Sequence, residues 1–132
     1  MSVAIITGAS SGIGREFARQ LKEIPGVDEF WFVARRTDRL EALAEELSVK
    51  AKIIGADLAT MEGVNRVREA LKEENPRVRF LVNAAGFGKF GSFDQVPEEE
   101  IVRMMDLNDK ALVLITHMTI PYMEEGGRII EM

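Results

Sequence analysis

TGASSGIG, residues 7–14, is the stretch of this sequence that decides the fold. It follows an apolar run at residues 2–7 that is typical of a buried strand, and it precedes a segment with helical spacing of apolar residues. Gly8 permits a sharp turn, while Gly12 and Gly14 leave room for a ligand or a neighbouring strand. The following helix start offers free N–H groups and partial positive charge, which suit a phosphate, and Ser10 and Ser11 add hydroxyls.

Strand-like and helix-like segments alternate along the rest of the chain. The predicted strands are residues 2–7, 29–34, 50–56, 78–83 and 128–132. The first helix is expected to bury one face made of Ile13, Phe17, Leu21 and Ile24. Thr37 and Thr60 are the predicted N-caps of the next two helices. Their inward stripes are Leu40, Leu43, Ala44 and Leu47 in one helix, and Val64, Val67 and Leu71 in the other.

A longer helical run follows a loop rich in glycine and phenylalanine. Pro97 is expected to open this run in its first turn, with three glutamates at the positive end of the helix. The run is predicted to reach residue 125, where Gly126 and Gly127 end it before the fifth strand.

This alternation predicts an α/β fold of the doubly wound Rossmann type. Strand–helix–strand units favour a parallel sheet with helices on both faces, and right-handed crossovers leave few arrangements. We expect one domain, residues 1–132, with five strands in the order 3-2-1-4-5. Ligands in such sheets bind beyond the carboxyl ends of the strands, here between strands one and four.

Composition excludes several classes of protein. The 132 residues carry a formal net charge of -5 and no basic block, which argues against nucleic-acid binding. There is no cysteine, and no metal-ligand spacing is visible. The most apolar stretch, residues 111–123, is shorter than the ~20 residues of a membrane span. We therefore expect a cytoplasmic protein that uses neither metal nor membrane.

Four motifs together resemble the short-chain dehydrogenase/reductase family. TGASSGIG is similar to its glycine motif T-G-x-x-x-G-x-G, and Asp57-Leu58 stands where the family contacts adenine. Asn83-Ala84-Ala85-Gly86 resembles N-N-A-G, with alanine replacing the second asparagine. Asn108 matches the family's catalytic asparagine, which holds a water in a proton relay. The resemblance spans the whole chain and implies hydride transfer between nicotinamide and a small carbonyl or alcohol substrate.

The end of the second strand indicates which nicotinamide cofactor is used. An acid at this place favours NAD, whereas an arginine accepts the 2′-phosphate of NADP. Here the strand ends FVARR, with Ala34 in the acid's place and Arg35 and Arg36 after it. This favours NADP over NAD, although two solvated arginines at a helix start would give the same pattern.

Three further features of the sequence carry expectations about the site and its surroundings. Asn108 falls in the apolar stripe of residues 101–115, so it is expected to be buried and in need of partners. Phe87, Phe90 and Phe93 suggest that their loop borders the nicotinamide or substrate pocket. His117 is expected to be a structural histidine within an apolar helix.

The resemblance also indicates what these 132 residues lack. The family's serine follows the fifth strand, and its Y-x-x-x-K lies on the next helix, whereas Tyr122 is followed by MEEG. We therefore expect a truncated cofactor-binding part that is inactive by itself. It would form a homo-oligomer, because residues 111–123 are very apolar and the family packs this helix at a subunit interface. A stand-alone nucleotide-binding module remains an alternative, while a methyltransferase would need an acid that FVARR lacks.

Overall fold

The computed structural model describes residues 2–10, 12–86 and 93–132. Ser11, Phe87 and Phe90 lie outside the described residues, and Phe93 falls in a short 3-10 segment, Phe93–Gln95. The strands are β1 (Ser2–Thr7), β2 (Glu29–Ala34), β3 (Ala51–Gly55), β4 (Arg77–Asn83) and β5 (Met123–Glu131). The α-helices are α1 (Gly12–Lys22), α2 (Thr37–Leu47), α3 (Met61–Glu74), α4 (Glu98–Met105) and α5 (Ala111–Thr119).

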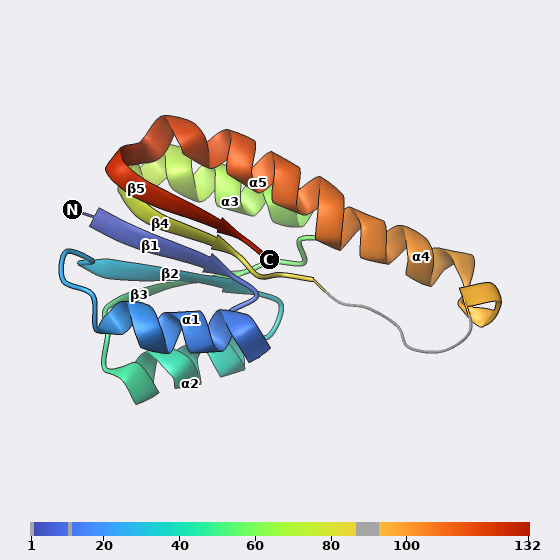
Figure 1. The fold of residues 1–132 in the computed structure, drawn as a ribbon, viewed down its shortest axis with the longest axis horizontal. Coiled ribbons are helices and arrows are strands. Elements are labelled where there is room, and N and C mark those ends of the chain that lie inside the picture. The colour runs from blue at the N-terminus through green and yellow to red at the C-terminus, as the bar shows by residue number, and fades with distance from the viewer. Residues whose placement is uncertain (1, 11, 87–92) are drawn as a thin grey trace.

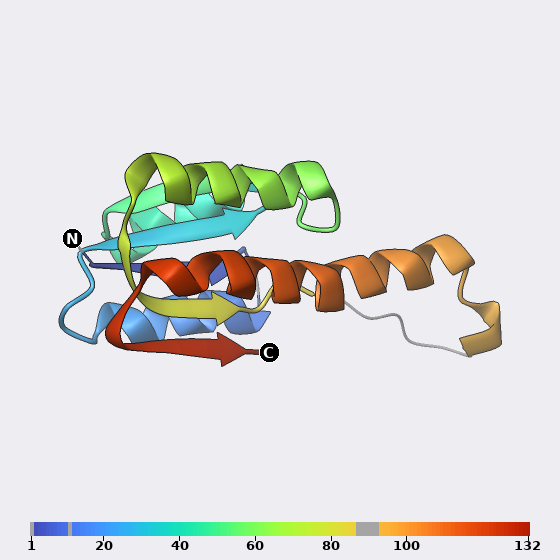
Figure 2. The same cartoon turned by 90° about the horizontal axis from the view of Figure 1, so that it is seen from above.

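The five strands form one parallel sheet in the order β3-β2-β1-β4-β5, which confirms the predicted topology. Figure 1 shows α1 and α2 on one face of the sheet and α3 and α5 on the other. In both views α4 extends beyond the carboxyl ends of the strands (Figures 1 and 2). The central strand β1 is buried along its whole length, because helices cover both of its faces.

Alternate residues of the strands build two cores, one on each face. Ile5 of β1 lies between Trp31 of β2 and Leu81 of β4, and all three pack on the side of α3 and α5. Ile6 points to the other face, where it joins Phe32 and the inward residues of α1 and α2. Full burial of side chains of this size contributes about 1.5–3 kcal/mol each. The sheet therefore provides a rigid platform at its carboxyl edge.

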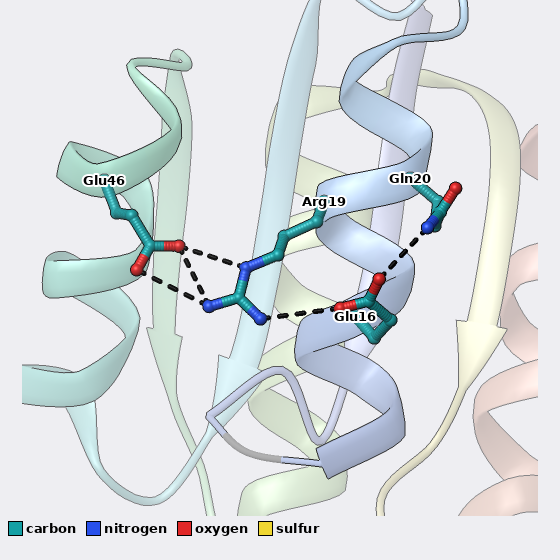
Figure 3. Close-up of polar contacts among 4 residues, drawn as sticks. All are labelled: Glu16, Arg19, Gln20 and Glu46. Atoms are coloured by element: carbon teal, nitrogen blue, oxygen red, sulfur yellow. Dashed lines mark hydrogen bonds and ion pairs between the residues drawn. The ribbon is translucent and has the colours of Figure 1, made fainter.

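Helices α1 and α2 pack side by side on their face of the sheet. The Arg19 guanidinium in α1 donates to both carboxylate oxygens of Glu46 in α2, with its shortest distance 3.1 Å, and it also reaches Glu16 (Figure 3). The predicted inward face of α1 was partly wrong. Ile13 is 57% exposed, and Ile24 lies beyond the end of the helix; Gly14, Ala18 and Leu21 are the buried residues.

The two predicted N-caps differ in outcome. Thr60 caps α3 as expected, because its side-chain oxygen accepts from the backbone N–H of Gly63 at 3.1 Å. Thr37 does not cap α2; the N-cap is Arg36, with no side-chain cap hydrogen bond. Thr37 is the first helical residue instead, and its methyl group lies so close to Gly55 that a Cβ there would be 2.6 Å from it.

The last third of the chain differs most from expectation. A π-helical turn, Asp106–Lys110, joins α4 to α5, and a 3-10 turn, Ile120–Tyr122, ends the helical run before residue 125. The two glycines at 126 and 127 lie inside β5, where the pairing with β4 shifts register. His117, expected to be a structural histidine, is exposed, since α5 turns Ala111, Ile115 and Thr119 toward the sheet. Within the described ranges, no helix has the length and apolar character needed to cross a membrane.

Candidate functional site

A pocket of about 670 Å³ opens at the carboxyl ends of the strands. This is the edge at which the topology predicts ligand binding, and the volume is typical of a site for a small molecule or cofactor. The pocket brings together most of the residues singled out from the sequence. They are Gly8, Ser10, Gly12, Ile13, Arg35, Arg36, Asp57, Leu58, Ala84, Ala85 and Gly86.

Seven other residues that line this pocket were not among the sequence-based candidates. Four of them follow from topology alone, since they flank the predicted residues at the ends of β2 and β3 or on α2: Val33, Ala34, Arg39 and Ala56. The other three, Glu100, Arg103 and Leu107, come from α4 and the π-helical turn. Nothing in the local pattern of that helical run indicates which of its faces meets the end of β3.

The backbone at Gly8 holds three strands together at the floor of the pocket. Its φ of +69° is strained for any residue with a side chain, and its N–H donates to the carbonyl of Val33 at 2.8 Å. A Cβ at this position would lie 2.7 Å from the backbone of Ala84 and Ala85. Glycine is therefore required here both for the turn out of β1 and for the close approach of the chain after β4.

Two predicted residues, Gly14 and Asn83, lie beside the pocket rather than on its wall. Gly14 packs against the Gly8 carbonyl, so it allows α1 to approach the loop closely. Asn83 is buried, and its side-chain amide donates to Thr116 Oγ1 at 2.9 Å and to Glu131 Oε1 at 3.1 Å. Thr116 in turn donates to Glu131 at 2.9 Å. Asn83 thus ties the ends of β4 and β5 to α5.

The end of β2 presents a cluster of positive charge to the pocket. Arg35 and Arg36 are both exposed, and Arg39 follows them in the first turn of α2. Arg36 Nε donates to Asp38 at 3.4 Å, and this hydrogen bond lowers the pKa of Asp38. The Arg35 charge also helps to lower the pKa of Asp57 across the pocket. The site therefore favours a ligand that carries negative charge near β2.

Asp57 forms the end wall of the pocket, beyond β3. Its Oδ1 accepts from the backbone N–H of Ala59 at 3.0 Å and from Arg103 Nη2 at 3.2 Å, while Oδ2 accepts from Arg103 Nη1 at 3.2 Å. Burial acts to raise the pKa of Asp57, but these hydrogen bonds and the charges of Arg103 and Arg35 outweigh it. The pKa of Asp57 is lowered overall, so the carboxylate is charged at neutral pH.

The lowered pKa of Asp57 predicts a pH-dependent contribution to stability. Below its ordinary value of about 3.9 the unfolded chain binds the proton more readily than the folded one, so stability rises with pH. The contribution is complete well above pH 4 and is lost as pH falls through the folded-state pKa. Asp57→Asn is expected to cost about 1 kcal/mol at pH 7 and less at pH 3, in urea unfolding followed at both pH values. An equal cost at both would contradict this account.

Asn108 is exposed, so the expectation that it faces the core was wrong. The π-helical turn adds a residue to one turn of helix and shifts the phase of the apolar stripe, which leaves Leu107 against the core. Asn108 points to Gly86 instead, where a Cβ would lie 2.5 Å from its Oδ1. The two residues border a second hollow of about 500 Å³, which also includes Ala84, Ala85 and Met132. Asn108 is thus beside the main pocket, separated from it by the chain after β4.

Comparison with known proteins assigns a family to this sequence and fold. The family model for short chain dehydrogenases matches residues 2–132. Sulfoacetaldehyde reductase 2 of Chromohalobacter salexigens is 37% identical over 131 residues, covering 95% of this chain and 50% of that protein. A short-chain dehydrogenase from Sphingobium yanoikuyae in complex with NADPH has a TM-score of 0.81 and 34% identity over 92% of this chain and 48% of its own.

A third similar protein extends the same pattern to an archaeal enzyme. The alcohol dehydrogenase of Thermococcus sibiricus, complexed with 5-hydroxy-NADP, has a TM-score of 0.81 and 32% identity, covering 92% of this chain and 53% of its own. The chain spans about half the length of the curated relatives it matches. The family model covers residues 2–132, nearly the whole chain, and the chain therefore belongs to the short-chain dehydrogenase family.

Proposed function

We propose that this chain binds NADP(H) as the cofactor-binding part of an oxidoreductase. The observation that carries the proposal is that a helix N-terminus and a pair of arginines open onto one pocket. Helix α1 has no acid in its first turn, whereas α2 and α3 have one each and α4 has three. The positive end of α1 is therefore free for the phosphates of a ligand.

The pocket residues fit the parts of a dinucleotide in order. Gly12 and Ser10 at the start of α1 would hold the pyrophosphate. The adenosine ribose would then lie at the end of β2, and the nicotinamide half would extend past the chain after β4, toward Asn108. When bound, the nicotinamide donates or accepts the hydride. The residues of this chain would bind the cofactor and orient it along the carboxyl ends of the strands.

The arginines at the end of β2 favour NADP over NAD. A planar guanidinium can donate two hydrogen bonds to one phosphate group, and Arg35 and Arg36 line the pocket where the 2′-phosphate would lie. Two similar proteins were solved with NADPH and with 5-hydroxy-NADP. These observations support the proposal that the cofactor is NADP(H).

The protein of which these residues form a part would transfer a hydride between the cofactor and a small carbonyl or alcohol compound. The developing alkoxide needs a proton donor, and Tyr122 does not meet this need. It lies before β5, at the opposite end of the strands from the pocket, and no lysine follows it by four positions. The acid would then come from outside residues 1–132, so these residues alone would bind cofactor without turnover.

We also propose that two copies of the protein associate. Val102 and Met105 in α4 and Val113 in α5 are each more than half exposed, as is Ile120 just after α5. Several large apolar side chains exposed on one helical run are typical of an interface between subunits. A cytoplasmic location would fit a reductase of this kind.

Calorimetric titration of the purified chain tests the cofactor proposal. We expect NADPH to bind, NADH to bind at least tenfold more weakly, and 2′,5′-ADP to bind more tightly than 5′-ADP. The last comparison isolates the 2′-phosphate from the nicotinamide half. Equal binding of NADPH and NADH would refute the choice of cofactor, and no binding of either would refute the proposal as a whole.

A further inference from the structure

Arg103 links α4 to the cofactor pocket. Helix α4 buries none of its side chains, and it extends away from the sheet in both views (Figures 1 and 2). From the last turn of this helix the Arg103 guanidinium reaches Asp57, which is 46 positions earlier in the sequence. Both side chains are 32% exposed, and both line the pocket. The pair therefore forms part of the pocket wall rather than a contact on the outer surface.

The hydrogen bonds of Asp57 fix the orientation of its carboxylate. Oδ1 accepts two hydrogen bonds, from Arg103 Nη2 and from the Ala59 backbone, so both of its lone pairs are used. Among the described residues Oδ2 accepts one, from Arg103 Nη1. One lone pair of Oδ2 is then left for a ligand. The two parallel bonds from the planar guanidinium also set the plane of the carboxylate, which a single bond would not do.

The topology places the base of a bound nucleotide beside this carboxylate. If the pyrophosphate lies at α1 and the ribose at the end of β2, the base continues in the same direction, because β3 is the next strand of the sheet. The walls there are Ala56, Asp57 and Leu58. Adenine offers a 6-amino donor at its edge, and a charged carboxylate is a pure acceptor.

We propose that Arg103 is a positioning residue for the adenine end of the cofactor. It holds the Asp57 carboxylate so that Oδ2 accepts a hydrogen bond from the 6-amino group. This inference rests on the proposed binding of NADP(H), but it concerns the base and not the 2′-phosphate. Its consequence is a preference for adenine over a purine that lacks the 6-amino group.

The test compares NADPH with its hypoxanthine analogue, in which a carbonyl oxygen replaces the 6-amino group. We expect the unaltered chain to bind NADPH about tenfold more tightly than the analogue, as one hydrogen bond to a charged group would give. Arg103→Met should weaken NADPH binding about tenfold and leave the analogue nearly unchanged, so the preference disappears. Arg103→Lys keeps the charge without the fork, and it should retain a smaller preference.

Arg19→Met is the matched control. Arg19 also forms a forked ion pair between two elements, with Glu46 (Figure 3). Neither residue lines the main pocket. This variant should keep both the affinity for NADPH and the preference for adenine. Thermal unfolding of each variant checks that the fold is retained. If Arg103→Met does not fold, the preference of Arg103→Lys for NADPH over the hypoxanthine analogue decides the test.

The possible results separate the two proposals. If the unaltered chain binds neither NADPH nor its analogue, the proposed function fails. If it binds NADPH but Arg103→Met and Arg103→Lys keep the full preference for adenine, the role of Arg103 is refuted while the cofactor proposal stands. A loss of affinity that is equal for NADPH and the analogue would also refute it, because Arg103 would then act on the shape of the pocket and not on the 6-amino group.

Discussion

Replacing Gly8 with alanine is expected to lower the free energy of unfolding by about 3 kcal/mol and to abolish NADPH binding. Two costs add at this position. A side chain at a φ of +69° costs about 1–2 kcal/mol. The new Cβ would also lie 2.7 Å from the backbone of Ala84 and Ala85, which cannot rotate away as a side chain could, and such overpacking costs about 1–3 kcal/mol. Urea unfolding gives the first quantity and calorimetry the second.

Gly126→Ala is the control that separates the two costs. Gly126 has a φ of +82°, similar to Gly8, but a Cβ there would meet nothing within 4 Å. This variant should lose about 1 kcal/mol from the backbone alone and keep its affinity for NADPH. Equal losses of stability in the two variants would mean that the contact between the loop after β1 and the loop after β4 contributes nothing.

Removing both arginines at the end of β2 is expected to weaken NADPH binding about a hundredfold. Each guanidinium would make charge-assisted hydrogen bonds with the 2′-phosphate, and the loss of two such groups in a partly exposed site corresponds to about 2.7 kcal/mol. Binding of NADH, which carries no 2′-phosphate, should change less than threefold in Arg35→Ala/Arg36→Ala. Titration with both cofactors measures the change in preference directly.

A control variant with the same change of net charge shows whether the loss of NADPH affinity comes from these two arginines or from net charge alone. Lys22 and Arg77 are exposed and do not line the pocket, so Lys22→Ala/Arg77→Ala removes two positive charges elsewhere. This variant should bind both cofactors nearly as the unaltered chain does, since the solvent screens charges beyond about 10 Å. If the control and the double arginine variant lose NADPH affinity equally, the arginines act only through net charge.

The strands and their order could be predicted because periodicity and connectivity are local signals. Residues 3–6 form a continuous apolar run, and the helix after the second strand repeats Leu40, Leu43 and Leu47 at helical spacing. All three leucines are buried in the structure. Alternation of strands and helices then leaves few parallel arrangements, and the position of the pocket follows from the arrangement.

The predictions that failed concern structural features that neighbouring residues in the sequence do not determine. An apolar stripe that repeats every 3.6 residues along residues 101–115 predicts that Asn108 faces the core. One π-helical turn is enough to rotate the residues after it relative to this stripe. The glycines at 126 and 127 were interpreted as a break between elements, yet they lie within a strand that changes register against β4. The Asp57–Arg103 pair was missed because its partners are 46 positions apart.

The central place of β1 has a consequence for how the chain is made. Ser2 of β1 pairs with Arg77 of β4, so one edge of this strand, which is wholly buried in the fold, stays open until about 75 more residues have been synthesised. At 5–20 residues per second that delay is roughly 4 to 15 seconds. During that interval β1 has only β2 as a neighbour, and its other edge can pair with another nascent chain. A ribosome that pauses before residue 83 would prolong this exposure, and chaperones that cover apolar strands would be most useful to this protein at that point.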